Sequence, residues 1–332
     1  MRKENRLKNK KIARKSFIFA LLVCWIGVAF YGWKQTQADD SSNLQTIVIG
    51  YQAGDEFDIS QARGELVEKM EAQGYKVVFK EFQNGSAEMQ ALASGSIDYA
   101  RIGDTPGVSA LAAGTDLTYV AVGGKKDQGS GILVHNDSGI DSAEDLAGKT
   151  IAYTQGTSSQ YLVMKALAAA GLTTDDVNLV SLDQSAASVA YADGTVDAWA
   201  NWDPATSQAE VTDNSKLVVS GSDIGDNNRS YIVAASDFAE ENEEATALLI
   251  EYTNEDMEWA NENTDELVDL LTDSLGVDQA VVEKMVSRRT YSMTAMTSES
   301  VSELQDIADL FYTEGLIENK VTVSDHVQYA ED

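Results

Sequence analysis

Hydrophobic positions along the chain follow two alternating spacings. Short apolar runs such as Thr46–Gly50 and Lys76–Phe82 are rich in β-branched or aromatic residues and are followed by turn residues, which predicts strands. The segments between them, such as Ile59–Met70, repeat their apolar residues at helical spacing. Strand and helix alternate as far as about Val211. This βα repetition predicts an α/β fold with mostly parallel sheets and helices on both faces.

Two features of the pattern predict a division into two lobes. The glycine-rich stretch Gly123–Gly131 offers a hinge. Beyond about Phe238 the alternation gives way to consecutive helices. We therefore expect a first lobe, a second lobe, and a return strand with helices that pack back on the first lobe. These parts are expected at residues 45–122, 127–228 and 229–327, in that order.

Residues 1–38 have the pattern of an export segment. Residues 1–15 carry eight Lys or Arg against one acidic residue, Glu4, and the apolar run Ser16–Trp33 contains no charge. This order is typical of a secretory signal peptide or of a membrane anchor with its positive end inside the cell. Cleavage after Thr36-Gln37-Ala38, lipid attachment at Cys24 and retention as an anchor are three alternative fates. Each predicts an extracytoplasmic location, in the periplasm or on the outer face of the cell membrane.

The overall charge excludes one large class of function. The chain has 54 Asp and Glu against 24 Lys and Arg, a formal net charge of −30. Such a field repels polyphosphates, so nucleic acid is not expected as a partner. Hydrophobic residues make up 43% of the chain, which is enough for a packed core. One cysteine and two histidines leave no disulfide framework and few groups for zinc binding or histidine-based catalysis.

Motif searches favour no cofactor, metal or catalytic site. Gly148-Lys149-Thr150 lacks the leading glycine of a phosphate loop and leads from a helix into a strand, the reverse of the required order. Asp223–Asn228 lacks the ligand spacing of a helix–loop–helix calcium site. An enzyme on this fold would need a nucleophile–base pair, which His135 and His326 do not offer at their predicted strand and tail positions. We therefore expect a protein that is not an enzyme.

Several predicted strands end at small or hydroxyl-bearing residues that open a helix. Helix N-termini expose free backbone N–H groups that favour an anion. Ligands in open α/β sheets gather at the carboxyl ends of the strands, so these turns can share one cleft. The alternative is that Ser86, Thr105 and Thr157 are ordinary helix caps. The candidate residues are Gly85, Ser86, Gly103, Asp104, Thr105, Thr157, Ser158 and Ser159.

Two further segments add aromatic and cationic candidates. Trp199 and Trp202 lie near the end of another predicted strand and point to opposite faces. We therefore expect Trp202, with Asp203 after it, in the cleft, and Trp199 either in the core or as a secondary lining residue. Arg229 precedes Tyr231 and an apolar strand that returns between the lobes. An arginine there can clamp an oxyanion with two hydrogen bonds, and the alternative is an inter-lobe salt bridge.

At these residues the chain resembles the aliphatic-sulfonate solute-binding proteins of ABC importers, a group that includes taurine and nitrate binders. The resemblance runs from about Thr46 to Val327. It implies a two-lobe periplasmic-binding-protein fold of type II, a small organic sulfonate as ligand, and delivery to a membrane permease with a separate ATPase subunit. It also implies that the candidate turns, Trp202-Asp203 and Arg229 lie in the cleft. The motifs that carry it are Gly103-Asp-Thr-Pro106, Gly156-Thr-Ser-Ser159, Asp197-Ala-Trp-Ala-Asn-Trp-Asp-Pro204, Asn228-Arg-Ser-Tyr231, Arg288-Arg-Thr-Tyr291 and Val323-Ser-Asp325.

The expected mechanism is capture without chemical change. Helix-start N–H groups and hydroxyls from both lobes would hold the sulfonate oxygens, with Arg229 contributing charge, while Trp202 and Tyr231 cover the organic tail. Asp104 and Asp203 would pair with the ammonium of an aminosulfonate, or else remain helix caps. An alternative ligand is a cationic amine or a pyrimidine precursor held in an aromatic cage. A receptor or adhesion role of an anchored surface protein is a further alternative.

Overall fold

The structure, a computed structural model, describes residues 44–329. The expected signal peptide or anchor of residues 1–38, with Cys24, lies outside the described residues. Within residues 44–329, no helix is both long enough and apolar enough to cross a membrane.

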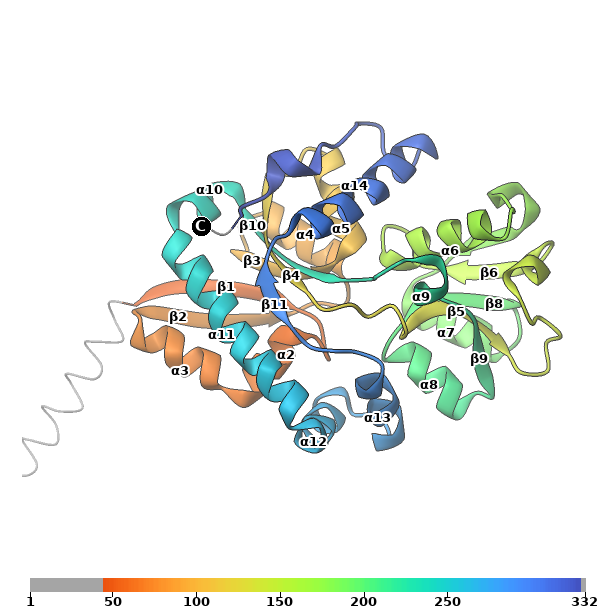
Figure 1. Ribbon diagram of the computed structural model, residues 1–332, viewed down its shortest axis with the longest axis horizontal. Coiled ribbons are helices and arrows are strands. Elements are labelled where there is room, and N and C mark those ends of the chain that lie inside the picture. The colour runs from red at the N-terminus through yellow and green to blue at the C-terminus, as the bar shows by residue number, and fades with distance from the viewer. Residues whose placement is uncertain (1–43, 330–332) are drawn as a thin grey trace, which may run out of the picture. The chain divides into compact units, whose positions relative to one another are not determined.

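The first lobe is built on a six-stranded sheet in the order β11-β4-β10-β3-β1-β2 (Figure 1). β1 and β3 are parallel, as expected for strands joined through helices. β10 comes from far along the chain, inserts between β3 and β4, and is antiparallel to both. The strands are β1 (Gln45–Tyr51), β2 (Tyr75–Glu81), β3 (Tyr99–Gly103), β4 (Leu117–Gly123), β10 (Ser230–Ala235) and β11 (Met293–Ala295).

The second lobe is built on a five-stranded sheet in the order β7-β6-β8-β5-β9. β6 is parallel to β7 and β8, whereas β5 is antiparallel to β8 and β9. The strands are β5 (Ser130–His135), β6 (Thr150–Tyr153), β7 (Asn178–Ser181), β8 (Ala198–Trp202) and β9 (Ser215–Ser220).

The α/β fold with two lobes is confirmed, but each sheet is mixed rather than mostly parallel. The difference arises at the strands that follow a passage between the lobes. Ser230, the first residue of β10, pairs with Gly103, the last residue of β3. Because the chain re-enters the first sheet at the carboxyl end of β3, β10 has to run in the opposite direction. Alternation of strands and helices predicts only the strands within one lobe. The two passages add the antiparallel pairings of β10 and β5, and β11, which follows α13, adds another with β4.

Helices cover both faces of each sheet because both faces are apolar (Figure 1). In β10, Ile232 and Ala234 pack with α2, α3 and α11–α13, whereas Tyr231 and Val233 pack with α4, α5 and α14. The helices of this lobe are α2 (Glu56–Arg63), α3 (Glu65–Ala72), α4 (Gly85–Ala93), α5 (Asp104–Ala112), α10 (Ser236–Glu241), α11 (Glu243–Glu262), α12 (Thr264–Leu275), α13 (Gln279–Ser287) and α14 (Ser298–Thr313). Those of the second lobe are α6 (Ser158–Ala169), α7 (Gln184–Ala192), α8 (Ala205–Thr212) and α9 (Gly221–Ile224).

Two short segments carry the chain between the sheets, residues 124–129 and 225–229. They lie side by side, since the backbone N–H of Lys126 donates to the carbonyl of Asn227 at 3.0 Å. The helices after Ala235 pack on the first sheet, so the hinge consists of these two segments.

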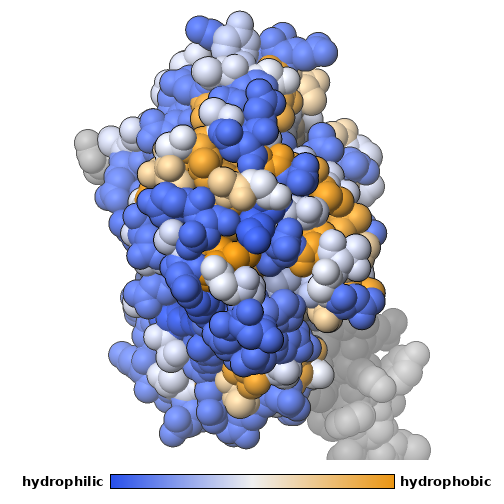
Figure 2. All heavy atoms as spheres, turned by 90° about the vertical axis from the view of Figure 1, so that its right-hand side faces the viewer, coloured by the Kyte–Doolittle hydropathy of each residue, from blue (hydrophilic) through white to orange (hydrophobic). Residues whose placement is uncertain are grey.

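The surface of the second lobe is largely hydrophilic, with hydrophobic residues in separate patches between the polar ones (Figure 2). Val189 on α7 and Val211 on α8 are its exposed large hydrophobic residues within the described part of the chain. This distribution agrees with the strong negative charge of the sequence, which favours solubility.

Candidate ligand-binding site

A cavity of about 200 Å³, here called the main cavity, lies where carboxyl ends of strands from both sheets meet the helices that follow them. Six of the residues expected from the sequence line it. They come from the β2–α4, β3–α5, β6–α6 and β8–α8 turns. These residues are Gly85, Gly103, Thr157, Ser158, Trp202 and Asp203.

The first-lobe wall of the cavity contains a buried charge cluster that sequence reasoning missed. Arg101 on β3 forms an ion pair with Glu56, and its Nε lies 3.7 Å from Oδ2 of Asp55. Asp55 also caps α2, because its Oδ1 accepts hydrogen bonds of 2.9 Å from the backbone N–H groups of Phe57 and Asp58. Burial raises the pKa of Asp55 to about 7 against the opposing effect of Arg101. The pKa of Glu56 stays well below its usual range, because the charges of Arg101 and Lys126 outweigh its burial.

Helices α5 and α6 begin at this region without a capping bond from an N-cap side chain. The Thr157 hydroxyl, at the N-cap of α6, instead donates to the Thr154 carbonyl at 2.7 Å. The expected role of this threonine as an ordinary cap is therefore wrong. Helix N-termini whose N–H groups lack a capping side chain favour a negatively charged ligand.

Gly103 lets the two lobes approach each other closely. A Cβ at this position would lie 2.9 Å from the Oγ of Ser158 in the second lobe. The Ser158 hydroxyl donates at 2.5 Å to Oδ1 of Asp104, the first residue of α5. A glycine before α5 therefore allows a polar contact between the lobes at the edge of the cavity.

On the second-lobe wall, the structure separates the two tryptophans. Trp202 lines the cavity, whereas Trp199 is buried in the core with Leu133. Asp203 is held by Ser207, whose backbone N–H and hydroxyl donate to its Oδ1 at 2.9 and 2.6 Å. Its buried Oδ2 has no hydrogen-bond partner among the described residues, and Nη2 of Arg289 lies 3.7 Å away.

Lys126 is a cationic lining residue without an ion-pair partner. It lies on the first hinge segment, and its ammonium has no hydrogen bond or ion pair within residues 44–329. Burial, together with the charges of Arg101 and Arg289, lowers its pKa to about 7, and Glu56 opposes this shift. A cavity-lining cation that makes no direct ion pair or hydrogen bond is a suitable partner for an anionic ligand.

Three other candidate residues lie just behind the wall of this cavity. The Ser86 hydroxyl donates at 3.3 Å to the Gly156 carbonyl in the other lobe. The Thr105 hydroxyl donates to Asp104 at 3.0 Å, and the Ser159 hydroxyl accepts from the backbone N–H of Thr154 at 2.9 Å. These side chains support the turns that border the cavity.

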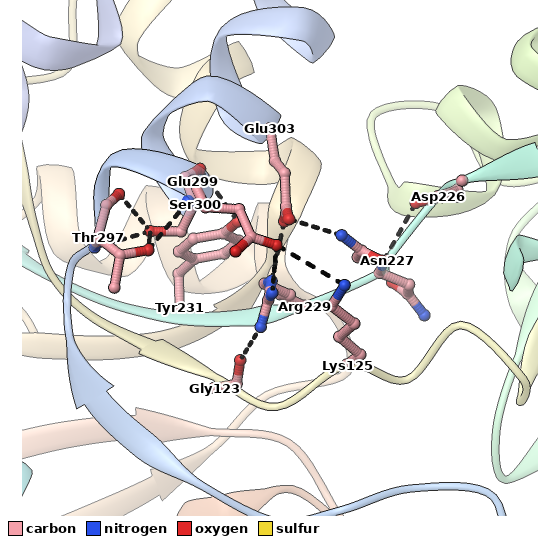
Figure 3. Close-up of polar contacts among 12 residues, drawn as sticks. Gly123, Lys125, Asp226, Asn227, Arg229, Tyr231, Thr297, Glu299, Ser300 and Glu303 are labelled. Carbon is pink, nitrogen blue, oxygen red and sulfur yellow. Dashed lines mark hydrogen bonds and ion pairs between the residues drawn. The ribbon is translucent and has the colours of Figure 1, made fainter.

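The structure places Arg229 outside the cavity lining, in a network with α14 (Figure 3). Its Nε donates to Glu303 at 2.9 Å, its Nη2 to Glu299 at 3.3 Å, and its Nη1 to the Gly123 carbonyl at 3.3 Å. Glu299 and Glu303 are one helical turn apart, so both face the hinge. This is the salt-bridge alternative considered from the sequence, here between the second hinge segment and the first lobe.

Arg229 instead borders a second cavity of about 40 Å³, together with Asp104, Asp226 and Tyr231. Tyr231 is fully buried and packs edge-on against Tyr119. Burial and the nearby charge of Asp104 raise the pKa of Asp226 to about 8. The residues first expected in one cleft therefore fall into three groups: six line the first cavity, Asp104, Arg229 and Tyr231 line the second, and Ser86, Thr105 and Ser159 line neither.

Sequence reasoning missed Lys126, Arg101 and Arg289 as lining residues. For Arg101 and Arg289 the available signals were the scarcity of arginine in an acidic chain and the motif Arg288-Arg-Thr-Tyr291, and for Lys126 it was only the pair Lys125-Lys126 in the glycine-rich hinge. None of these signals tells which of two adjacent basic residues faces a cavity.

Two α/β lobes, joined by short hinge segments around a polar cavity, define the periplasmic binding protein fold. The crystal structure of the aliphatic sulphonate binding protein SsuA from Escherichia coli matches with a TM-score of 0.81 and 30% identity, over 87% of this chain and 94% of that one. SsuA from Xanthomonas axonopodis pv. citri, bound to MOPS, matches with a TM-score of 0.80 and 29% identity, over 86% and 98%.

The sequence comparisons agree with the structural ones. A protein of Escherichia coli (strain K12) named for binding aliphatic sulfonates is 31% identical over 287 residues, 86% of this chain and 89% of that protein. The family described as NMT1/THI5 like matches residues 71–267. The chain belongs to this family, and the expected periplasmic-binding-protein fold is confirmed.

Proposed function

We propose that this protein is an extracytoplasmic solute-binding protein that captures a small organic sulfonate in the main cavity and delivers it to an ABC importer. The observation that carries the proposal is Lys126, a lining residue whose ammonium has no hydrogen bond or ion pair within residues 44–329, at a cavity that the N-termini of α5 and α6 also border. The names of the relatives that cover most of the chain agree with this ligand class.

The chemistry of the lining fits both ends of such a ligand. A sulfonate is a monoanion with three acceptor oxygens. A lysine, hydroxyls and backbone N–H groups that donate from several directions suit such a group. Thr157 and Ser158 supply hydroxyls from the second lobe. Trp202 and Phe82 supply apolar faces for the organic tail.

Binding and lobe closure are coupled in this proposal. Lys126 lies on the hinge, Gly85 and Gly103 belong to the first lobe, and Thr157 and Trp202 belong to the second. A ligand that contacts all of them favours the closed state by the difference between its affinities for the two states. The importer then recognises the ligand-bound protein by its closed form.

We infer that the protein is not an enzyme. The described residues that line the main cavity include no histidine and no cysteine. The Thr157 hydroxyl donates to a backbone carbonyl, which is no base, and the Ser158 hydroxyl donates to Asp104, a carboxylate that does not line the main cavity.

An aminosulfonate is the form of ligand that one specific observation supports. Oδ2 of the lining residue Asp203 has no hydrogen bond among the described residues and only an ion-pair contact of 3.7 Å with Arg289, so a ligand ammonium or hydroxyl would supply the missing hydrogen bond. The lining holds three basic residues, Arg101, Lys126 and Arg289, and three acidic ones, Asp55, Glu81 and Asp203, so a titration with a cationic amine is part of the test.

Isothermal titration calorimetry of the full chain in detergent tests the ligand class. The ligands are ethanesulfonate, 2-aminoethanesulfonate, a quaternary amine and a pyrimidine, and mass spectrometry of the recovered ligand tests for turnover. Binding of the sulfonates alone, with unchanged mass, supports the proposal. Binding of the amine or pyrimidine instead, or a changed ligand mass, contradicts it. The mass of the protein recovered from cells shows whether residues 1–38 are removed, lipidated or retained.

A further inference from the structure

Helices α8 and α13 belong to different lobes and lie next to each other (Figure 1). Val282 and Met285 on α13 are buried in the core that includes β1 of the first sheet. Ala209 on α8 is buried in the core of the second lobe with Trp199 and Leu133. Any contact between these helices is therefore a contact across the cleft.

The two helices meet through oppositely charged side chains. The guanidinium of Arg288, at the C-terminal end of α13, is paired with the carboxylate of Glu210 on α8. The ammonium of Lys284 lies 3.5 Å from the same carboxylate. The side chains of Arg288 and Glu210 are only 12% and 14% exposed, so the pair is largely removed from water.

This charged contact continues to the wall of the ligand cavity. Nη1 of Arg288 lies 3.7 Å from Oδ1 of Asp203, and Nη2 of Arg289 lies 3.7 Å from Oδ2 of the same residue. Asp203 and Arg289 both line the cavity. Two arginines of the first lobe thus converge on one carboxylate of the second lobe, which links the inter-lobe contact to the binding site.

Opening of the cleft would break all of these pairs together. A desolvated ion pair loses much more when one partner is removed than an exposed pair does, because the remaining charge is left without compensation. The ion pair between Arg288 and Glu210 therefore stabilises the arrangement in which the two lobes are closed. The hydrogen bond between Ser158 and Asp104 is a second inter-lobe contact, formed by residues outside this charged group.

We propose that Arg288 and Glu210 form a latch that holds the two lobes closed and sets the residence time of the bound ligand. They are positioning residues, since neither lines the main cavity. The latch rests on the proposed function for its ligand, but its effect on lobe closure exists without one. In the ligand-bound protein the latch changes the rate constant of ligand dissociation, because the ion pair forms after the ligand has entered an open cleft.

Stopped-flow fluorescence with ethanesulfonate and the full chain in detergent measures the two rate constants. We expect Glu210→Gln to raise the dissociation rate constant about tenfold and to change the association rate constant less than about twofold. Arg288→Gln should have the same effect. The matched control is Glu283→Gln, which removes the same charge from an exposed position of α13 whose side chain accepts a hydrogen bond only from Gln279.

The charge-reversed variant Glu210→Arg tests the sign of the contact. It should accelerate dissociation at least as much as Glu210→Gln, because it places a positive charge beside Arg288 and Lys284. Circular dichroism and thermal unfolding establish that each variant is folded. An unchanged dissociation rate in folded Glu210→Gln, or equal effects of Glu210→Gln and Glu283→Gln, would overturn the latch.

A distance measurement without ligand keeps the latch testable if sulfonates do not bind. Spin labels are attached at Val189→Cys in the second lobe and Tyr312→Cys on α14, in a Cys24→Ser background. Both sites are exposed. Pulsed electron paramagnetic resonance then measures the inter-lobe distance. Glu210→Gln should shift the ligand-free distribution toward longer distances. An unchanged distribution refutes the latch, whereas absence of sulfonate binding to the wild type refutes only the proposed function.

Discussion

Replacing Lys126 by glutamine tests the electrostatic basis of the proposed site. The substitution removes the positive charge of a lining residue whose ammonium has no partner within residues 44–329. Glutamine keeps a comparable length and a hydrogen-bond donor, so the change isolates charge. Because the ammonium is partly desolvated at the cavity wall, its loss should weaken an anion more than the loss of an exposed lysine would.

The expected magnitude follows from the kind of interaction that is lost. A hydrogen bond to a charged group contributes about 1.5–3 kcal/mol. This corresponds to a loss of affinity of about 10- to 150-fold. Titration calorimetry with ethanesulfonate at pH 6.5, where Lys126 is mostly protonated, measures the effect directly.

The neighbouring lysine provides the matched control. Lys125 carries the same charge, but its side chain is 48% exposed, lies 3.7 Å from Glu299 and does not line the main cavity. Lys125→Gln should change the affinity by less than about twofold, because exposed charges are screened by salt. Equal losses in the two variants, or no loss in Lys126→Gln, would refute a direct role of the Lys126 ammonium.

The pH dependence of binding gives an independent check. The pKa of Lys126 in the free protein is lowered to about 7, and an anion binds the protonated form better. Above pH 7 the ligand must draw in a proton, so affinity should fall by up to about tenfold per pH unit. Asp55, with a pKa of about 7, gains negative charge over the same range and acts in the same direction. Lys126→Gln should therefore show a smaller pH dependence than the wild type, and identical slopes would contradict the assignment.

Four other residues give sharp expectations. Trp202→Ala should reduce the affinity gained per methylene of an alkanesulfonate, which is at most about fourfold when the methylene is fully covered; calorimetry with short and long chains measures this, and equal losses would exclude tail contact. Arg229→Ala should lower the free energy of unfolding by about 1–3 kcal/mol, because Glu303 loses its partner, and leave affinity within about threefold; lost affinity with intact stability would favour the anion clamp instead. Asp226→Asn should stabilise the protein increasingly as pH rises toward 8, because the folded wild type must ionise a buried acid whose pKa is about 8; denaturant unfolding that shows a pH-independent difference would contradict this. Gly103→Ala should weaken sulfonate binding several-fold with little change in the ligand-free melting temperature, since its Cβ would meet Ser158 across the cleft; unchanged affinity would show that this approach is unimportant.

The sequence alone determined the local structure and the class of fold. Hydrophobic period distinguishes strands from helices, because a strand repeats every second residue and a helix every third or fourth. The turns at Gly85, Gly103 and Thr157 were also visible, since small and hydroxyl-bearing residues after a strand mark the start of a helix. The rule that strand ends of one α/β sheet share an edge brings Gly85 and Gly103 together, whereas their meeting with Thr157 depends on how the two lobes pack.

Only the tertiary structure decided how the charges are distributed. Lys125 and Lys126 are adjacent residues of the same type, yet only Lys126 lines the main cavity. Arg229 could serve an anion or a salt bridge until Glu299 and Glu303, some seventy positions later, were placed beside it. Periodicity records which side of an element is apolar, whereas the partner of a charge is set by long-range packing. That is also why a latch between α8 and α13 has no signature in either helix alone.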